Sequence, residues 1–180
     1  MTEPAPWHAS FPNPRTPDPP ALPRATLLQW LQQGTKTPGS DFLLVDLRRT
    51  DLEGGTIRGS LNLPAQSLYP TLSTLYNLVR AAGVTDVVFY CGIFPLFSPT
   101  LLCRVFSLLP MAEADPGVIV GSCGGRGTRA AGWFADYLAD QGAESEVKSW
   151  KLEGGIKGWV NEGGEYTGLM DGFDGAVWAK

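Results

Sequence analysis

The order of hydrophobic and polar residues along the chain predicts strands and helices in alternation. Two short runs are almost continuously apolar and end in polar or reactive residues, 41–48 (DFLLVDLR) and 86–91 (DVVFYC). Such runs are typical of strands buried on both faces of a parallel sheet. A turn with a short strand is predicted over Gly54–Pro64, and a last strand, a Gly-Gly turn and a short helix over 147–164.

Three other segments repeat apolar side chains at the period of an amphipathic helix. They cover 22–34, 71–83 and 128–142, and each ends in a glycine, a common helix stop. Strands that alternate with helices predict a single α/β domain with a central parallel sheet flanked by helices. Ligands bind at the carboxyl ends of the strands in such sheets, and Cys91 lies at one of these ends.

The N-terminal segment follows neither period. Eight of the fifteen prolines fall within residues 1–24, so this segment is predicted to be a disordered or polyproline-like arm. It has no apolar stretch of the kind that a signal peptide needs. The remaining chain is long enough for one domain with a core, which is predicted over 25–175.

Charge and cysteine content narrow the classes of function. The net charge is −4 with a pI near 4.9, which gives no electrostatic reason to bind nucleic acid. An anionic substrate must therefore be attracted by local charge at a site. Three irregularly spaced cysteines do not suggest a disulfide framework, and a reducing compartment, cytoplasm or nucleus, is expected.

Histidine is nearly absent, and this limits the chemistry. The lone histidine, His8, lies in the Pro-rich arm, so Ser-His-Asp and Cys-His catalysis within the fold and a Cys/His zinc cluster are not expected. A reactive thiol would need activation without histidine. Asp171 and Asp174 near the C-terminus are weak evidence for a metal, and none is assigned.

A stretch of 29 residues, Ile93–Gly121, resembles neither the strand before it nor the helix after it. Without this insert, Cys91-Gly92 would join Ser122-Cys123-Gly124-Gly125-Arg126 directly between strand and helix. The result is a cysteine, five residues and an arginine, at the edge of the sheet where ligands bind.

That spacing has a chemical rationale. In a tight turn of small residues the backbone N–H groups can point inward as an anion nest, and the following helix N-terminus adds positive charge. An arginine offers a planar fork to a tetrahedral oxyanion. The same field lowers a cysteine pKa from about 8.5 toward ~3.5–7.5, which produces a thiolate nucleophile without histidine. The candidate oxyanion-binding residues are Gly92, Ser122, Cys123, Gly124 and Gly125.

The segments LLVDLR, GGTIRGSLNLP, VVFYCG, SCGGRGTRAAGWFADYL and LEGGIKGW resemble those of a rhodanese-fold domain. The resemblance spans Phe42–Trp159 apart from the insert and is closest to the branch with cell-cycle dual-specificity phosphatases and fungal arsenate reductases. It implies an arsenate reductase or phosphatase with Cys91 as nucleophile and Arg126 as oxyanion clamp, and no bound cofactor. For a reductase it also implies glutathione and glutaredoxin as reductant, hence a thiol reductant protein as partner.

Three positions depart from the family pattern. Thr56 and Tyr90 stand where histidine is usual, and Gly125 where the cell-cycle phosphatases carry a glutamate. Protein-phosphatase activity is the part of the resemblance that these changes weaken. Cys123 would either resolve a Cys91 adduct as a disulfide, which suits a reductase, or be only a small loop residue.

The insert leaves several interpretations open. It could be a lid, a membrane-inserted stretch, or a retained intron or gene-model error absent from the working protein. If it is translated, Cys123 and Arg129 form a second pair with the same spacing, preceded by the strand-like residues Val118–Val120. The alternatives to an oxyanion enzyme are a catalytically impaired rhodanese-like interaction module and a sulfurtransferase.

Other conspicuous residues are expected to be structural or supporting. Asp46 and Arg48 end the first buried strand. They are expected either to support the loop between Cys91 and Arg126 or to form a buried ion pair. Arg58 is expected to be a solvated turn charge. Core positions are predicted for four aromatic residues: Trp133, Phe134, Tyr137 and Trp159.

Overall fold

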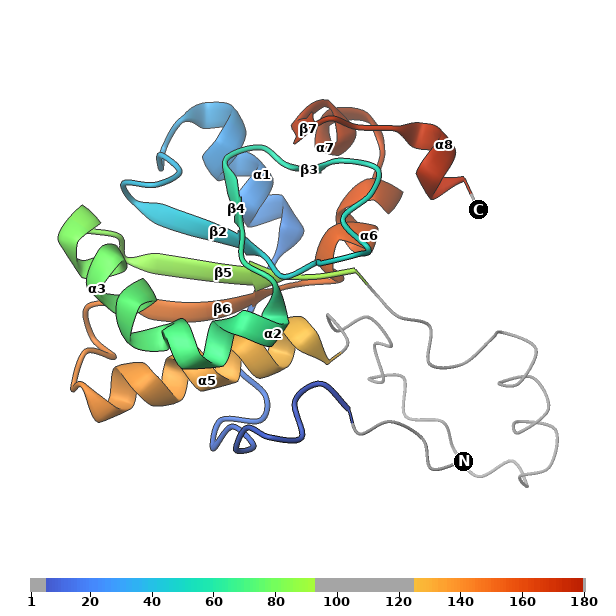
Figure 1. The fold of residues 1–180 in the computed structure, drawn as a ribbon. Helices are drawn as coiled ribbons and strands as arrows, with labels where there is room; N and C mark the ends of the chain where they lie inside the picture. Colours follow the sequence, from blue (N-terminus) through green and yellow to red (C-terminus); the bar gives the residue numbers. More distant parts are fainter. Residues whose placement is uncertain (1–5, 93–124, 180) are drawn as a thin grey trace, which may run out of the picture.

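A five-stranded sheet with helices on both faces forms the centre of the molecule (Figure 1). The computed structural model describes residues 6–92 and 125–179. The strands lie in the order β1-β6-β5-β2-β4, and every pairing is parallel. Their bounds are β1 Ala21–Leu22, β2 Phe42–Asp46, β4 Ser60–Asn62, β5 Asp86–Tyr90 and β6 Lys148–Leu152. The α/β fold with a central parallel sheet is confirmed.

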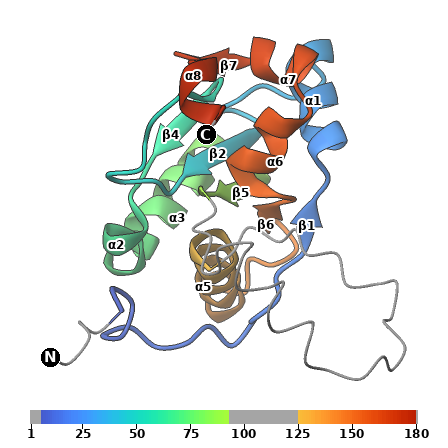
Figure 2. The same cartoon turned by 90° about the vertical axis from the view of Figure 1, so that its right-hand side faces the viewer.

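The helices divide between the two faces (Figures 1 and 2). One face carries α1 (Arg24–Gln33) and α6 (Gly155–Asn161). The other carries α2 (Ala65–Leu68), the 3₁₀ turn η1 (Tyr69–Thr71), α3 (Leu72–Ala82) and α5 (Arg126–Asp140). Figure 2 shows the two groups on opposite sides of the sheet. The sheet is therefore covered on both faces, as its continuous apolar strands require.

Strand β5 shows how alternation along a strand builds two cores. All five of its residues are buried. Val87, Phe89 and the following Cys91 pack in the cluster shared with α3 and α5, whereas Val88 and Tyr90 pack in the cluster shared with α1 and α6. Successive side chains on a strand point to opposite faces, so Tyr90 and Cys91 serve different layers.

Two predicted helices end on their glycines. Gly34 after α1 and Gly83 after α3 adopt the left-handed conformation, with φ of 61° and 72°. The third helix, α5, begins at Arg126, before its predicted start at Thr128, so that Arg126 belongs to the first helical turn.

The N-terminal segment differs from the prediction. A disordered or polyproline-like arm was predicted over 1–24; in the structure residues 6–20 run along α5, below it in Figure 1, and lead into β1, which pairs with β6. The indole of Trp133 donates to the Pro12 carbonyl at 2.8 Å, and Asp136 accepts the backbone N–H of Arg15 at 2.6 Å. The proline-rich composition did not indicate these contacts, because backbone groups make them, including the carbonyl of a proline.

The C-terminal segment folds back on the turn before β3 (Thr56–Ile57). It forms α7 (Gly164–Gly168), β7 (Met170–Asp171) and α8 (Gly175–Trp178), and β7 pairs antiparallel with β3. The indole N–H of Trp178 donates to the Gly54 carbonyl at 2.7 Å. The turn that follows β2 is thus held from outside by the end of the chain.

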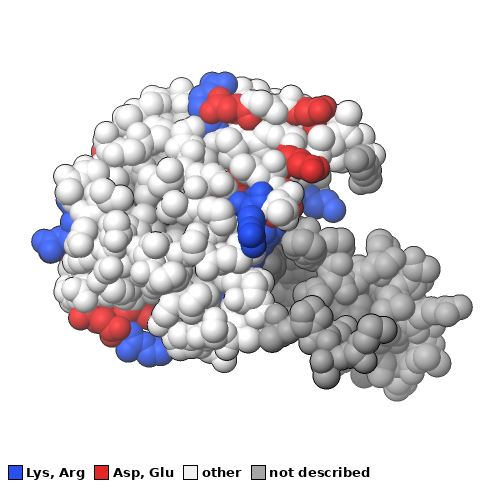
Figure 3. Space-filling view, in the orientation of Figure 1, with Lys and Arg blue, Asp and Glu red and all other residues white. Residues whose placement is uncertain are grey.

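Three further observations bear on the sequence-based expectations. In the described part of the chain no helix has the length and apolar character needed to cross a membrane. On the face seen in Figure 3, charged side chains of both signs lie in small groups. The insert Ile93–Gly121 lies outside the described residues, and so do Ser122, Cys123 and Gly124.

Candidate functional site

Cys91 lies at the carboxyl end of β5, where the sheet opens toward the start of α5. Its side chain is fully buried among the residues between the sheet and α5. Its carbonyl accepts the backbone N–H of Ile156 at 3.2 Å, which ties the strand end to α6. The thiol position is therefore set by β5 and by helices on both faces.

Arg126 is the first residue of α5, and its guanidinium turns back to the same edge of the sheet. Its two terminal nitrogens donate to the Asp51 carboxylate at 2.9 Å and 2.5 Å, and one of them also donates to the Gly92 carbonyl at 3.4 Å. The hydrogen bonds to Asp51 raise the pKa of Arg126 above its ordinary value, and the charge and a hydrogen bond of Cys91 raise it further. The structure thus brings the predicted nucleophile and the predicted clamp together.

Asp51 is the residue at this site that sequence reasoning missed. It lies in the loop 47–55 after β2, and its pKa is lowered to about 2, chiefly by the hydrogen bonds from Arg126. A side chain at Gly92 would bring its Cβ within 3.0 Å of the Asp51 carboxylate, so a glycine there permits the close approach. The sequence carried only a partial signal, because Asp51 follows the first of two predicted parallel strands; the pairing of β2 with β5 brings the loops after both strands to the same edge of the sheet.

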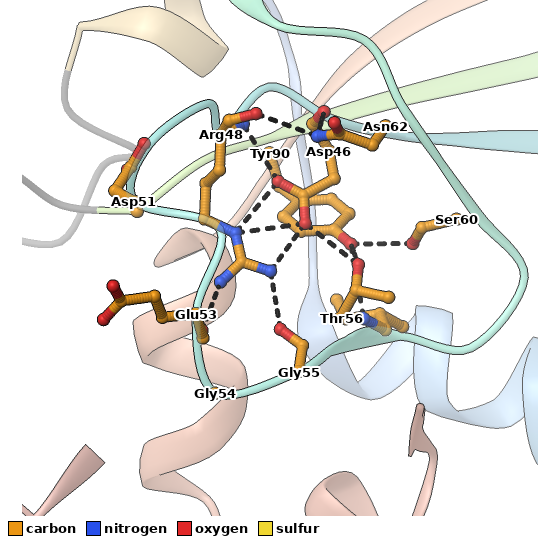
Figure 4. A network of polar contacts seen from close by, with 12 residues as sticks. Asp46, Arg48, Asp51, Glu53, Gly54, Gly55, Thr56, Ser60, Asn62 and Tyr90 are labelled. Atoms are coloured by element: carbon orange, nitrogen blue, oxygen red, sulfur yellow. Dashed lines mark hydrogen bonds and ion pairs between the residues drawn. The ribbon is translucent and has the colours of Figure 1, made fainter. Parts of the chain in front are cut away.

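Asp46 and Arg48 form a buried ion pair behind that loop (Figure 4). Arg48 donates to the Asp46 carboxylate at 2.7 Å and to the carbonyls of Glu53 and Gly55 at 2.9 Å and 2.6 Å. Asn62 donates to the Asp46 and Arg48 carbonyls at 2.9 Å and 2.8 Å. These contacts close the loop 47–55 that carries Asp51. The predicted buried ion pair is confirmed. Support of the loop between Cys91 and Arg126 stays a prediction, because 93–124 lie outside the described residues.

Two positions that depart from the family pattern meet in this network. The Thr56 and Tyr90 hydroxyls lie 2.7 Å apart, and Thr56 also donates to Asp46 at 2.9 Å (Figure 4). Tyr90 donates to Ser60 at 2.7 Å and accepts the backbone N–H of Ile57 at 3.3 Å. Burial raises the pKa of Tyr90 well above its usual range, so its hydroxyl stays neutral. Tyr90 and Thr56 together occupy a place where the pattern has two histidines.

A pocket of about 440 Å³ opens beside the Arg126–Asp51 pair. Its wall includes Arg49 and Thr50 from the loop after β2, Gln66 from α2, and Gly125 and Arg129 beside Arg126. The arm contributes Pro6, Trp7 and His8 to the lining. The histidine that was set aside because it lies in the arm therefore lines the same pocket as Arg126. Burial and then the positive charge of Arg129 lower the pKa of His8.

The remaining site predictions divide into described and undescribed residues. Gly92 and Gly125 are the described residues on either side of 93–124, and Gly125 precedes α5 with a φ of 83°. Arg129 lies farther along α5 and donates to the Asn13 side chain at 3.1 Å. Its proposed partner Cys123 is not described, so the alternative pair Cys123–Arg129 and the anion nest stay predictions.

The residues expected to be structural are found in such roles. Trp133, Phe134 and Trp159 are buried, and Tyr137 packs against the core from a partly buried position. Arg58 is exposed and forms an ion pair with Asp171 at 3.3 Å.

Several solved structures share the fold of this chain. Two structures of the Saccharomyces cerevisiae protein Ygr203w share 21% and 20% identity with the chain, with TM-scores of 0.51 and 0.53. Both matches cover 88% of this chain, and they cover 95% and 91% of the two yeast chains, respectively. That protein is described as a protein tyrosine phosphatase of the rhodanese family and as a homolog of single-domain rhodanese and of the Cdc25 phosphatase catalytic domain.

An As-Sb reductase from Leishmania major is also similar in structure. It shares 18% identity with a TM-score of 0.58, and the match covers 85% of each chain. No protein-family model matches the sequence, and no curated protein matches it. At these identities the matches establish the fold: the chain has the single-domain rhodanese-like architecture.

Proposed function

We propose that this protein is a cysteine-dependent enzyme acting on a tetrahedral oxyanion, with Cys91 as nucleophile and Arg126 as the group that binds the oxyanion. The observation that carries the proposal is the meeting of these two side chains at one edge of the sheet, although they are far apart in the sequence. A guanidinium beside a thiol stabilises the thiolate, and its planar fork matches two oxygens of the anion.

The Asp51 carboxylate occupies the two guanidinium nitrogens of Arg126 that would bind the oxyanion. Both carboxylate oxygens accept from the outer nitrogens of the guanidinium, which is the geometry of a bidentate phosphate or arsenate contact. Binding of the substrate then requires Asp51 to leave Arg126. Asp51 thus keeps the guanidinium oriented in the absence of substrate and competes with the anion for it.

For a phosphate ester the reaction has two displacements. The Cys91 thiolate attacks phosphorus, a sulfur–phosphorus bond forms, and the bond from phosphorus to the ester oxygen breaks. The leaving oxygen takes a proton from water. Water then attacks the cysteinyl phosphate, the sulfur–phosphorus bond breaks, and inorganic phosphate and the thiolate are released.

For arsenate the same attack begins a reduction. The thiolate displaces hydroxide from arsenic, which leaves as water after protonation. A glutathione thiolate then attacks the Cys91 sulfur, and the electrons of the sulfur–arsenic bond pass to arsenic, so that arsenite leaves. A second thiol reduces the mixed disulfide that remains on Cys91.

Two assays on the purified full-length chain separate these reactions. Release of phosphate from an aryl phosphate without thiols identifies the hydrolase, and arsenate turnover that depends on glutathione and glutaredoxin identifies the reductase. The Cys91→Ser variant should lose either activity while its unfolding curve stays close to that of the wild type. Full activity in that variant would exclude Cys91 as the nucleophile.

Anion binding tests the alternative of an interaction module without catalysis. Calorimetry with tungstate or phosphate should give heat of binding that the Arg126→Met variant lacks. A wild-type chain that binds neither anion would favour the interaction module. The same measurement on a chain in which Gly92 is joined to Ser122 tests whether Ile93–Gly121 belongs to the working protein. Transfer of sulfur from thiosulfate to cyanide would favour the alternative of a sulfurtransferase.

A further inference from the structure

The pocket beside Arg126 is larger than an inorganic oxyanion needs. Its volume is about 440 Å³, whereas a water molecule occupies about 30 Å³ and a tetrahedral anion is only a few times larger. Pockets of roughly 300–1,000 Å³ are those that enclose whole organic ligands. The space next to the guanidinium therefore suits a substrate with a body attached to its anionic group.

The lining of the pocket combines charged and apolar residues. Its lining includes three arginines, Arg49, Arg126 and Arg129, and one acidic residue, Asp51. The N-terminal arm contributes Pro6, Trp7 and His8 to the same lining. The Trp7 ring packs edge-on against the rings of His8 and Trp133, with centroids 5.2 Å and 6.1 Å apart. The pocket thus combines cationic residues, which favour an anion, with an aromatic residue that can pack against an apolar group.

The arm is held to α5 by enough contacts to keep Trp7 in this place. Phe11 packs against Trp133, with ring centroids 5.8 Å apart. Farther along, the Asp136 carboxylate accepts the backbone N–H groups of Arg15 and Thr16 at 2.6 Å and 3.1 Å. Where the arm crosses α5, a Cβ on Gly132 would lie 2.4 Å from the Thr16 carbonyl, so only glycine permits this approach.

Building on the oxyanion chemistry of Cys91 and Arg126, we propose that the arm is the outer wall of the substrate pocket and that Trp7 determines specificity. Trp7 packs against the aromatic or apolar body of an organic phosphate ester while Arg126 holds its anionic group. The substrate class is thus an ester with an apolar leaving group, in preference to a bare inorganic oxyanion.

Binding of two anions that share a head group tests the proposal in the full-length chain. Inorganic phosphate probes the head group alone, and phenylphosphonate adds an aromatic body that cannot be hydrolysed from it. The wild type should bind phenylphosphonate at least tenfold more tightly than phosphate. In Trp7→Ala this preference should fall about tenfold, which is the size expected for loss of one aromatic packing partner, while the phosphate Kd stays within twofold. Trp7→Phe should restore most of it.

Phe11→Ala is the matched control. Phe11 also packs against Trp133 from the arm, but it does not line the pocket. If Phe11→Ala removes the preference as strongly as Trp7→Ala, order of the arm and not the Trp7 ring is responsible, and the assignment of Trp7 is overturned. It is also overturned if the wild type binds both anions equally.

The same binding experiment distinguishes failure of the proposed oxyanion function from failure of the proposed role of Trp7. If the wild type binds neither anion, the proposed oxyanion function fails, and the role of Trp7 fails with it. If phosphate binds and Arg126→Met abolishes the binding, but Trp7→Ala leaves the ratio of the two Kd values unchanged, the oxyanion site stands and only the role of the arm is rejected.

Discussion

The Arg48–Asp46 pair and the Arg126–Asp51 pair lie at the same edge of the sheet, but only the first is closed off from solvent. The side chains of Arg48 and Asp46 are 1% and 0% exposed, against 9% and 29% for Arg126 and Asp51. In the first pair the arginine also donates to two loop carbonyls, whereas the second borders a pocket. The same two residue types thus close a loop in one place and stay accessible to an anion in the other.

The difference teaches that surroundings, more than residue type, decide what an ion pair does. A buried pair is costly to break because the partner that remains is a charge without solvent. A pair at the mouth of a pocket can exchange its carboxylate for another anion at little cost, since the new oxygens satisfy the same donors. The following variants test that division from the largest expected effect to the smallest.

Breaking the buried pair should give the largest loss of stability. Arg48→Met leaves the Asp46 carboxylate buried and removes the hydrogen bonds to Glu53 and Gly55. We expect the free energy of unfolding in urea to fall by about 3–5 kcal/mol. Arg58→Met, which breaks the exposed pair with Asp171, should change it by less than about 1 kcal/mol. Equal losses in the two variants would contradict the comparison.

Removing the guanidinium of the second pair should abolish anion binding and leave the fold. Arg126→Met loses two charge-assisted contacts to the oxyanion, so we expect the phosphate Kd from calorimetry to rise about 100-fold. The unfolding curve should shift far less than in Arg48→Met. Arg129→Met serves as the comparison variant. If it loses phosphate binding and Arg126→Met does not, Arg129 is the operative arginine, as in the alternative pair with Cys123.

Removing the competing carboxylate should strengthen anion binding. Asp51→Asn keeps the size of the side chain and takes away the charge that occupies Arg126, so we expect the phosphate Kd to fall about tenfold. The rate of Cys91 alkylation should also reach its plateau at lower pH, because one negative charge near the thiolate is gone. A weaker phosphate affinity in this variant would mean that Asp51 serves only to orient Arg126.

The low pKa of Asp51 also predicts the pH dependence of stability. With a folded-state pKa of about 2, below the unfolded value of 3.8, the ionised carboxylate stabilises the fold fully above pH 3.8. That contribution is lost as the pH falls through 2. The stability difference between the wild type and Asp51→Asn should therefore shrink from pH 5 to pH 2, and a constant difference would contradict the assignment.

A modest loss of stability is expected at the hydroxyl that supports the buried pair. Tyr90→Phe removes the contacts to Thr56 and Ser60 but keeps the ring in its core. We expect a loss of about 1–2 kcal/mol in the free energy of unfolding, with an unchanged phosphate Kd. Weaker phosphate binding in this variant would show that the network reaches the anion site.

Local patterns sufficed to predict several parts of the fold. The apolar runs around Val45 and Phe89 indicated strands buried on both faces, and helical periodicity with Gly34 and Gly83 marked two helix ends. Both signals arise within a few residues of one another, so no knowledge of the tertiary fold is needed. The place of Cys91 at the end of a parallel strand could be predicted for the same reason.

Contacts between distant segments could not be predicted in this way. Nothing local to Asp51 indicated that it would hold Arg126, and nothing in the Pro-rich segment indicated that Trp7 and His8 would line its pocket. Thr56 and Tyr90 looked like separate departures from a motif until the fold placed their hydroxyls 2.7 Å apart.

The sequence by itself determined the architecture, because burial of apolar strands and helical stripes dictates which faces meet in a parallel α/β sheet. It also supplied the chemistry of the candidate site, a cysteine and an arginine at the carboxyl edge. Only the tertiary structure decided which aspartate each arginine holds and which terminal segment closes the pocket. Those choices depend on the register of neighbouring strands and on the path of the arm over Gly132, and both are set by packing between segments distant in the chain.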